Sequence, residues 1–156
     1  MNELELMREA IKAGLEGMNA NHGGPFGCVI VKNGEIIARG YNKVLLLNDP
    51  TAHAEVTAIR EACSKLNSFQ LTDCEIYTTC EPCPMCMGAI YWARPKKVYY
   101  ANTREDAAAI GFDDSFIYDE IAQPIQMRKL IMECVGRDEA LHMFKAWQEK
   151  NNKTLY

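Results

Sequence analysis

The sequence contains no long apolar segment, and we expect no secretory leader. No stretch approaches the roughly 20 consecutive apolar residues of a membrane-spanning helix, so we expect no membrane partner. The first ten residues, MNELELMREA, carry acidic side chains where a signal peptide would have an apolar core. We therefore expect a cytoplasmic protein.

The sequence also lacks an excess of positive charge. Its 17 Lys and Arg residues face 21 Asp and Glu residues, which gives a formal net charge of −4 at pH 7. Proteins that bind a nucleic-acid backbone use Lys and Arg to displace its counterions. The basic residues form only one small cluster, Arg94, Lys96 and Lys97, which is typical of a solvated strand end. Nucleic acid is therefore not an expected partner.

Neither an internal repeat nor a low-complexity tract is present. Hydrophobic residues make up 48% of the 156 positions and charged residues 24%, as in an ordinary globular protein. The length suits one compact domain over residues 1–156. The cysteines number seven, an odd count, and without a leader we expect them to be reduced. A cysteine cluster then indicates a metal site or catalysis.

Hydrophobic periodicity predicts how the chain begins. Apolar residues at spacings of three and four predict an amphipathic first helix with this buried stripe: Leu4, Met7, Ile11, Leu15 and Met18. Asn33–Gly34 lies between two apolar runs and predicts a β-hairpin. A second helix is predicted to open at residues 48–50 and to bury Val56, Ile59, Cys63 and Leu66.

Three further strands are predicted after the hairpin, at residues 74–79, 96–101 and 127–135, with helices between and after them. Strands joined through helices should run parallel to each other, whereas the hairpin strands should be antiparallel. This order predicts a three-layer α/β/α sandwich with a mixed five-stranded sheet.

Residues 78–86, TTCEPCPMC, place a cysteine at every third position: Cys80, Cys83 and Cys86. A redox C-x-x-C motif usually follows the first strand of a thioredoxin-like unit, whereas two strands and two helices are predicted before this one. A bacterial iron–sulfur run would need a further cysteine at position 90, which is Ile90. Zinc is the remaining interpretation: a structural zinc takes four protein ligands, and a catalytic zinc takes three.

His53 is the natural third ligand beside the two later cysteines. Glu55 follows it after one residue, whereas His22 and His142 have no catalytic-looking neighbourhood. An acid beside a metal-bound histidine is what metal-assisted hydrolysis needs in order to move protons. The pattern therefore favours a catalytic zinc.

A binding module with a structural zinc is the alternative from another functional class. Cys80 would then join His53, Cys83 and Cys86 in a closed Cys₃His cage, and Glu55 would be an ordinary surface acid. This alternative leaves the pairing of His53 and Glu55 unexplained.

The predicted helix starts make a catalytic site geometrically plausible. Residues i and i+2 inside a helix point about 200° apart, so His53 and Glu55 converge only in a first turn. Cys83 and Cys86 also lie at a helix start, where Pro84 suits the first turn. The positive ends of two helix dipoles favour thiolates and a zinc-bound hydroxide. We therefore expect the site between the N-termini of the second and third predicted helices.

His-Ala-Glu at 53–55 followed by Pro-Cys-Pro-Met-Cys at 82–86 matches the H-x-E…P-C-x-x-C signature of zinc nucleobase deaminases. From the first helix to about Ala101, the sequence resembles the cytidine-deaminase-like superfamily. The stretches NDPTAHAEVTAIR, GAIYWARPKKVYYA and, above all, GFDDSFIY at 111–118 resemble the branch of short bacterial guanine deaminases, as does the terminal Tyr156.

The resemblance implies one Zn²⁺ per chain, held by His53, Cys83 and Cys86, with water or hydroxide as the fourth ligand. In such an enzyme, Glu55 would take a proton from this water and the hydroxide would attack C2 of guanine. Glu55 would then return protons to the ring nitrogen and to the departing ammonia, and xanthine would remain. The expected role is a hydrolase of purine catabolism. Cys80 is not a ligand in this superfamily.

The resemblance also implies a homodimer whose chains exchange their C-terminal segments, so that the tail of one chain covers the site of the other. A last helix and an aromatic tail beyond Gln123–Pro124 are compatible with such a domain swap. Tyr156 is then expected to act as a lid over the partner's site.

A flat nucleobase calls for apolar faces and a few placed polar groups. Phe26 and Trp92 are candidates for the faces, and core packing is their plain alternative. Asn42 is expected to donate to O6 or N7 of the base, with a role as a turn residue as the alternative. Ala54 is a further expected substrate contact.

Asp114 is expected to bind the amine and a ring N–H of the base, or to serve as a second proton relay. The alternative for Asp113 and Asp114 is a helix cap, and the resemblance favours Asp114 as the functional residue.

A tRNA adenosine deaminase, or another nucleobase or nucleoside deaminase, is the rival enzyme because it shares the zinc motif. The acidic composition and the lack of a basic tail argue against the tRNA enzyme.

Overall fold

Four strands form one mixed sheet in the order β2-β1-β3-β4. The strands are β1 (Gly27–Lys32), β2 (Glu35–Tyr41), β3 (Cys74–Cys80) and β4 (Lys97–Asn102). Strand β1 pairs antiparallel with both β2 and β3, and β3 pairs parallel with β4. The predicted orientations are confirmed, because β3 and β4 are joined through a helix and β1 and β2 form the hairpin. Asn33 and Gly34 both have positive φ at its turn, as a type I′ turn requires.

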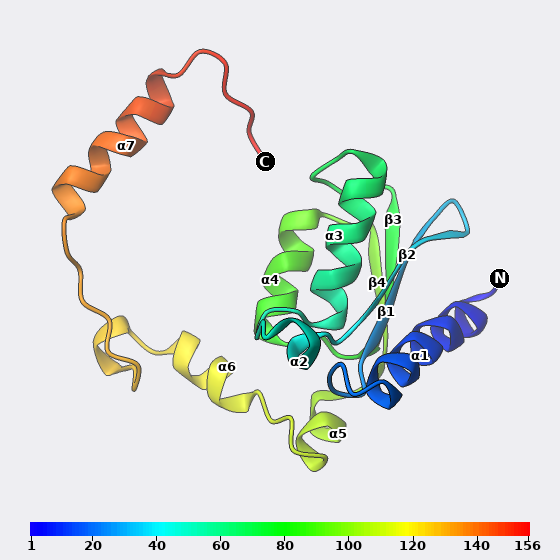
Figure 1. The fold of residues 1–156 in the computed structure, drawn as a ribbon. Coiled ribbons are helices and arrows are strands. Elements are labelled where there is room, and N and C mark those ends of the chain that lie inside the picture. The colour runs from blue at the N-terminus through cyan, green and yellow to red at the C-terminus, as the bar shows by residue number, and fades with distance from the viewer. The chain divides into compact units, whose positions relative to one another are not determined.

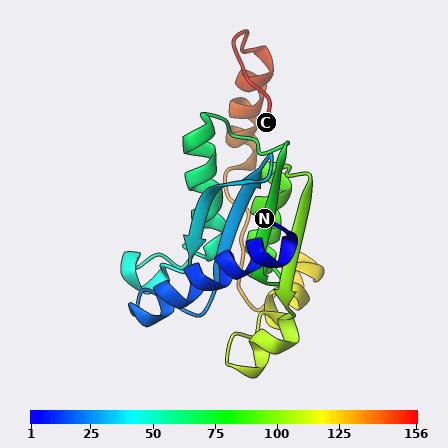
Figure 2. The same cartoon turned by 90° about the vertical axis from the view of Figure 1, so that its right-hand side faces the viewer.

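The computed structural model describes all residues from Met1 to Tyr156, and their contacts divide the chain into two units, Met1–Asp114 and Ser115–Tyr156. In the first unit, helices α3 (Ala54–Leu66) and α4 (Pro84–Ala93) cover one face of the sheet (Figure 1). Helix α1 (Glu3–Asn19) crosses the opposite face (Figure 2). This arrangement confirms the three-layer sandwich.

Alternation along the strands distributes the core between the two faces of the sheet. Ile30 and Ile76 pack on the side of α3 and α4, whereas Val29 and Tyr77 pack with residues of α1 on the other side. Both faces of the two central strands are therefore buried, which makes β1 and β3 a rigid base for side chains at their ends.

The predicted stripe of α1 was wrong in three of its five positions. Leu4, Ile11 and Leu15 are exposed, and the buried residues of α1 are mostly small: Leu6, Met7, Ala10, Ala13, Gly14 and Gly17. A Cβ atom at Gly14 would lie 2.9 Å from the backbone nitrogen of Gly27. Around Gly14 the helix therefore approaches the sheet too closely for a side chain, whereas Leu6 and Met7 fit nearer its N-terminus.

Helix α3 shows the same preference for small residues, and it begins at Ala54 rather than directly after residues 48–50. Its buried residues are Ala54, Glu55, Ala58 and Ala62, whereas the predicted stripe is only partly buried. A short helix that the sequence did not predict, α2 (Val44–Leu47), precedes it.

The predicted fifth strand at residues 127–135 does not form. The segment follows a 3₁₀ turn, η1 (Ile125–Met127), and contributes no residue to the four-stranded sheet. A strand needs a neighbour that satisfies its backbone N–H and C=O groups, and no ladder partner is present for this segment.

The remaining helices are α5 (Arg104–Ala109), α6 (Ser115–Ala122) and α7 (Arg137–Glu149). No helix combines the length and the apolar character that crossing a membrane requires.

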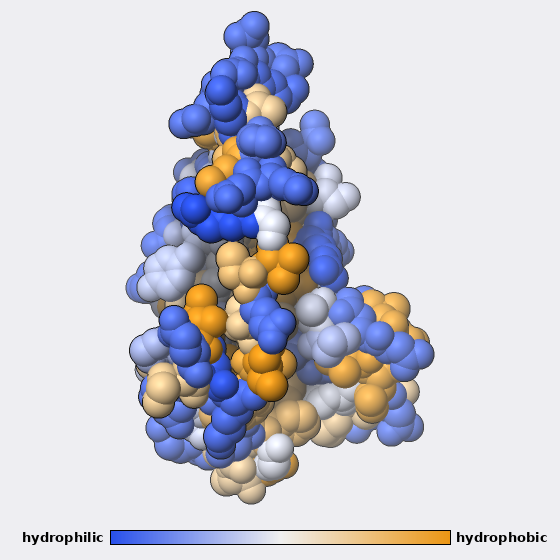
Figure 3. All heavy atoms as spheres, turned by 90° about the vertical axis from the view of Figure 1, so that its left-hand side faces the viewer, coloured by the Kyte–Doolittle hydropathy of each residue, from blue (hydrophilic) through white to orange (hydrophobic).

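The second unit, Ser115–Tyr156, has no buried residue. Large apolar side chains remain exposed on it, among them Leu130, Ile131, Val135, Met143 and Phe144. Figure 3 shows large hydrophobic side chains at the molecular surface. A unit without a core is not an independent domain, and the prediction of one domain over residues 1–156 stays a prediction.

Candidate metal and active site

Three metal-binding side chains come together at two helix starts. His53 is the N-cap residue of α3, Cys83 is the N-cap residue of α4, and Cys86 lies in the first turn of α4. Pro84 occupies the first position of α4, where its missing N–H leaves no hydrogen bond unmade. The ligand atoms of the three residues lie within 4.8 Å of one another.

The separations within this group suit a zinc ion. His53 Nδ1 lies 3.5 Å from Cys83 Sγ and 3.6 Å from Cys86 Sγ. A tetrahedral zinc at about 2.3 Å from sulfur and about 2.0–2.1 Å from nitrogen implies N-to-S separations of about 3.6 Å. Two thiols and one imidazole are also a donor set that zinc prefers. The residues present therefore fit this metal.

Protons are unevenly distributed among the three donors. A hydrogen bond from Cys86, with a further one from His53, lowers the pKa of Cys83 to about 4. The contact with Cys83, together with burial, raises the pKa of Cys86. The hydrogen bond to Cys83 raises the pKa of His53. These contacts therefore favour the thiolate form of Cys83, which attracts a cation.

Glu55 lies in the first turn of α3 and is only 6% exposed. Its Oε1 accepts a hydrogen bond of 2.7 Å from the hydroxyl of Thr78 on β3. A buried carboxylate is costly unless it is hydrogen-bonded or paired. Glu55 is therefore not the ordinary surface acid that a structural zinc module would have.

Cys80 does not belong to the group of metal donors. It is buried at the end of β3, and its Sγ lies 3.7 Å from the carbonyl oxygen of Thr103. Burial, with the nearby carboxylate of Glu55, raises the pKa of its thiol to about 11. Because Cys80 Sγ lies outside the cluster of His53, Cys83 and Cys86, the structure has no closed Cys₃His cage.

Asn42 and Phe26 lie on adjoining segments of the first unit. The backbone N–H of Asn42 donates to the carbonyl oxygen of Phe26, and its Oδ1 accepts from the N–H of Val44 at 3.0 Å. Because Oδ1 is already bound, the side chain offers its NH₂ group as a donor. Phe26 packs at the edge of the core and meets Phe112 edge to face at 5.0 Å.

Asp114 is half-buried at the end of the first unit. Burial is the main cause that raises its pKa, and the charge of Cys83 adds to the increase. Arg104 opposes the increase.

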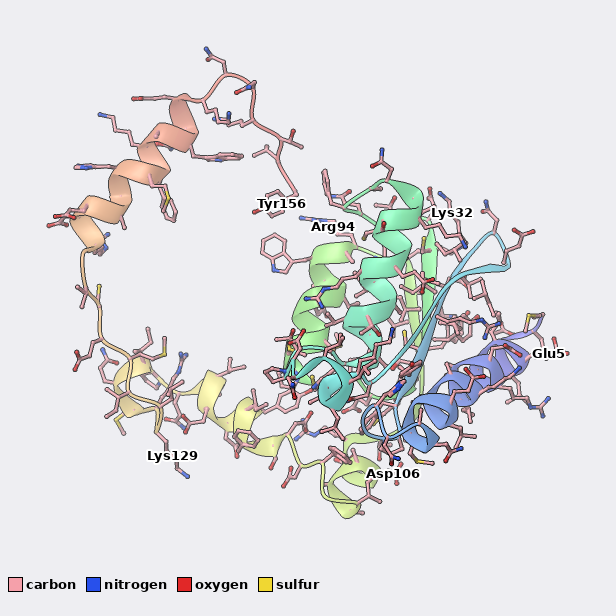
Figure 4. The ribbon with its side chains drawn as sticks, viewed as in Figure 1. Glu5, Lys32, Arg94, Asp106, Lys129 and Tyr156 are labelled. Atoms are coloured by element: carbon pink, nitrogen blue, oxygen red, sulfur yellow. The ribbon has the colours of Figure 1, made fainter.

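Two other expected contacts differ in where they lie. Ala54 is fully buried as the first residue of α3, and such a residue has a backbone N–H without an acceptor inside the helix. Trp92 is 62% exposed near the other end of α4, about 13 Å along the helix from Cys83. Arg94, labelled in Figure 4, caps that end, and its guanidinium lies over the Trp92 ring. The structure does not bring Trp92 to the metal donors of its own chain.

Tyr156 is an exposed residue of the second unit, and its expected lid role stays a prediction. Three further residues close to the site were not singled out from the sequence: Gly23, Thr78 and Phe112. The Gly-Gly pair at 23–24 was a usable signal, since consecutive glycines often mark a close backbone approach. A threonine within a strand is ordinary and carries no such signal.

Comparisons with known proteins agree with this geometry. A profile described as the cytidine and deoxycytidylate deaminase zinc-binding region matches residues 1–102. The chain is 56% identical to the guanine deaminase of Bacillus subtilis (strain 168) over 156 residues, which cover 100% of both sequences. An X-ray structure of guanine deaminase from Bacillus subtilis superposes with a TM-score of 0.97 at 56% identity, covering 100% of this chain and 99% of that one.

A second kind of relative matches a smaller part of the chain. The tRNA-specific adenosine deaminase of Aquifex aeolicus (strain VF5) is 52% identical over 77 residues, which cover 49% of this chain and 51% of the relative. The full-length similarity is thus to guanine deaminase, and the partial similarity is to tRNA-specific adenosine deaminase.

Proposed function

The chain belongs to the cytidine and deoxycytidylate deaminase family, and from this premise we propose that it hydrolyses guanine to xanthine and ammonia. The observation that carries the proposal is the full-length similarity to a guanine deaminase, joined to a buried carboxylate beside a His-Cys-Cys group. The expected location of the protein in the cytoplasm stays a prediction.

His53, Cys83 and Cys86 would hold one zinc ion per chain and leave its fourth position for water. Zinc, when bound, supplies a Lewis acid that lowers the pKa of bound water from about 15.7 to about 7. The two helix N-termini at the site contribute partial positive charge, which stabilises the thiolates of the ligand set.

Glu55 would carry the protons of the reaction. Its carboxylate accepts a proton from the attacking water, delivers it to a ring nitrogen next to C2, and assists the departure of ammonia from that carbon. Its position two residues after His53, in the same first helical turn, supports this role. Its burial supports the role as well, because a proton carrier shielded from bulk water transfers its proton to the substrate.

Two hydrogen-bond donors and one aromatic ring would recognise the base. The NH₂ group of Asn42 is directed by the bond between Oδ1 and Val44, and it suits an acceptor such as O6 or N7. The free N–H of Ala54 at the start of α3 suits a second acceptor. Phe26, supported by Phe112, offers an aromatic face for the flat ring.

Asp114 would bind the amine and a ring N–H of guanine, or relay a second proton. Burial raises the pKa of Asp114, which supports the role of a proton relay. Adenine presents no amine at C2, so an acceptor at this position favours guanine.

Deamination of tRNA adenosine is the second candidate, and the partial similarity to the Aquifex aeolicus protein is the observation that favours it. A panel assay of ammonia release from guanine, adenine, cytosine, cytidine, guanosine and tRNA separates the two. We expect release from guanine. No release from guanine, with release from tRNA, would overturn the choice of substrate and leave the zinc site standing.

We propose further that the chain is a homodimer whose C-terminal segments are exchanged. The second unit supports this, because it has no buried residue although it carries many large apolar side chains. Within that unit, a hollow of about 520 Å³ is lined by apolar residues such as Phe116, Ile121, Leu130 and Met132, together with four charged ones: Asp119, Glu120, Arg128 and Lys129. Apolar surface of this kind is normally covered in the assembled protein.

Mixed dimers test the exchange. A Glu55→Gln chain lacks the proton carrier but keeps Tyr156, whereas a Tyr156→Ala chain keeps Glu55. If the tail of one chain covers the site of the other, co-expression of the two restores one complete site per mixed dimer. Activity no higher than that of the separate variants would contradict the exchange.

A further inference from the structure

The carboxylate of Glu55 is anchored to the sheet through one strand residue. The hydroxyl of Thr78 lies 2.7 Å from Glu55 Oε1, and Thr78 is only 1% exposed. Thr78 is paired with Cys28 on one side and with Tyr100 on the other, in the interior of the sheet. A residue held by ladders on both sides is a rigid anchor for a side chain that reaches down from a helix start.

This anchor matters because the last torsion of a glutamate side chain has no sharp preference of its own. Without a partner, the carboxylate of Glu55 would rotate and direct neither oxygen reliably. A hydrogen bond to Oε1 fixes the plane of the group and thereby the direction of Oε2. Displacing a reacting group by about 1 Å can lower a rate by about 100-fold.

A hydroxyl is also suited to a partner that gains and loses a proton. Thr78 Oγ1 lies 3.2 Å from the carbonyl oxygen of Cys80, in addition to its contact with Glu55. A hydroxyl has one proton to donate and two lone pairs that accept. Thr78 can donate to Glu55 as a carboxylate, or accept from it as a carboxylic acid while donating to Cys80. The hydroxyl is therefore a suitable partner for Glu55 in either protonation state.

We infer that Thr78 is a positioning residue of the deamination reaction, which holds Glu55 Oε1 so that the carboxylate stays directed at the reacting water and base. The inference rests on the proposed role of Glu55. It does not require Thr78 to touch the substrate or the metal.

Two substitutions in the full-length protein separate the hydroxyl from the packing. Thr78→Val replaces the hydroxyl by a methyl group of similar size, whereas Thr78→Ser keeps the hydroxyl and removes the methyl. For Thr78→Val we expect kcat for guanine to fall by about 10- to 100-fold, with KM within about twofold of wild type. Zinc content per chain should not change. Thr78→Ser should keep kcat within about threefold, since the bond to Glu55 remains.

Thr79→Val is the matched control. Thr79 is buried on the same strand, and its hydroxyl accepts from the backbone N–H of Gly27 rather than bonding to Glu55. The substitution removes a buried hydroxyl hydrogen bond of 3.1 Å on the same strand, so its melting temperature should fall as well. Its kcat should stay within about threefold of wild type.

Several results would overturn the inference. These are a kcat of Thr78→Val within about threefold of wild type, equal losses in the Val and Ser variants, or an equal loss in the Thr79→Val control. If Thr78→Val does not fold, the Ser variant still tests the inference. A kcat of Thr78→Ser about tenfold or more below wild type would overturn it, because this variant keeps the hydroxyl. Glu55→Gln separates the two levels of the argument. If that variant turns over normally, the role of Glu55 fails; if it is inactive while Thr78→Val is fully active, only the role of Thr78 fails.

Discussion

The two units of the chain differ in what they bury. Met1–Asp114 has apolar clusters on both faces of its sheet, and it contains every donor of the proposed metal site. Ser115–Tyr156 has three regular segments and a high share of large apolar residues, but it buries none of them. Apolar residues stabilise a fold only when they leave water. The first unit therefore carries the proposed metal site, and the exposed apolar residues of the second unit support the proposal that it packs against a further chain.

This division can be tested by measuring two properties of each variant: turnover of guanine and molar mass in solution. A substitution at the site in the first unit should change turnover and leave the mass unchanged. A substitution on the apolar surface of the second unit should lower the molar mass in solution, and any change in turnover should follow from that.

Glu55→Gln should have the largest effect. Removing the proton carrier should lower kcat by about 10²–10⁴-fold or more, because the amide neither accepts nor delivers the proton. Zinc content and molar mass should stay as in wild type. Glu61→Gln is the matched control, because Glu61 lies on the same helix, is exposed, and would still accept from the N–H of Arg39. Turnover of Glu55→Gln at the rate of the control would contradict the mechanism.

The second unit should respond in the opposite way. Phe144 and Trp147 lie three residues apart on α7 with exposures of 68% and 41%, so they share one face of the helix. Changing both to Ala should weaken the dimer by about 10- to 1,000-fold in dissociation constant, if they are anchors of the interface. Light scattering over a dilution series measures this change.

Activity should then depend on protein concentration in the double variant, and kcat should recover at high concentration. Gln148→Ala on the same helix is the control and should leave the dimer intact. An unchanged mass at every dilution would show that α7 does not contribute to assembly.

Gly23→Ala should affect binding of the base more than the chemical step. A Cβ atom at this position would collide with the side-chain and backbone oxygens of Asn42, so Asn42 would have to move. We expect KM for guanine to rise by about tenfold, the scale of one lost hydrogen bond, with kcat nearly unchanged. Gly88→Ala adds the same methyl group where nothing lies within 4 Å, and it should leave KM unchanged. An equal KM for guanine in the two variants would show that Asn42 does not contribute to binding of the base.

Cys80→Ser should have the smallest effect. The serine hydroxyl can still donate to the carbonyl oxygen of Thr103, and the zinc donors are elsewhere. Zinc content should remain one per chain, and kcat should stay within about twofold of wild type, as expected for a residue outside the ligand set. Loss of zinc, measured by elemental analysis, would restore the closed Cys₃His cage as an explanation.

Local patterns in the sequence predicted much of the first unit. The turn at Asn33–Gly34, the first-turn proline Pro84 and the spacing of Cys83 and Cys86 depend on neighbours along the chain, and the structure has each where it was expected. The prediction of the buried stripe of α1 was wrong because contacts with the distant strands decide which side chains of this helix are buried. Gly14 and Gly17 face the sheet in place of Ile11 and Leu15, because the strands lie too close for larger side chains.

The sequence by itself therefore determined the metal donors and the starts of the helices that carry them. Both depend on interactions within a few residues of the chain. The tertiary structure decided which side chains surround that set. Register places Thr78 beneath Glu55, close packing places Gly23 against Asn42, and the absence of a ladder partner leaves residues 127–135 outside the sheet. These outcomes depend on how separate segments pair and pack in three dimensions, and the hydrophobic periodicity of one segment does not identify the segment that it contacts.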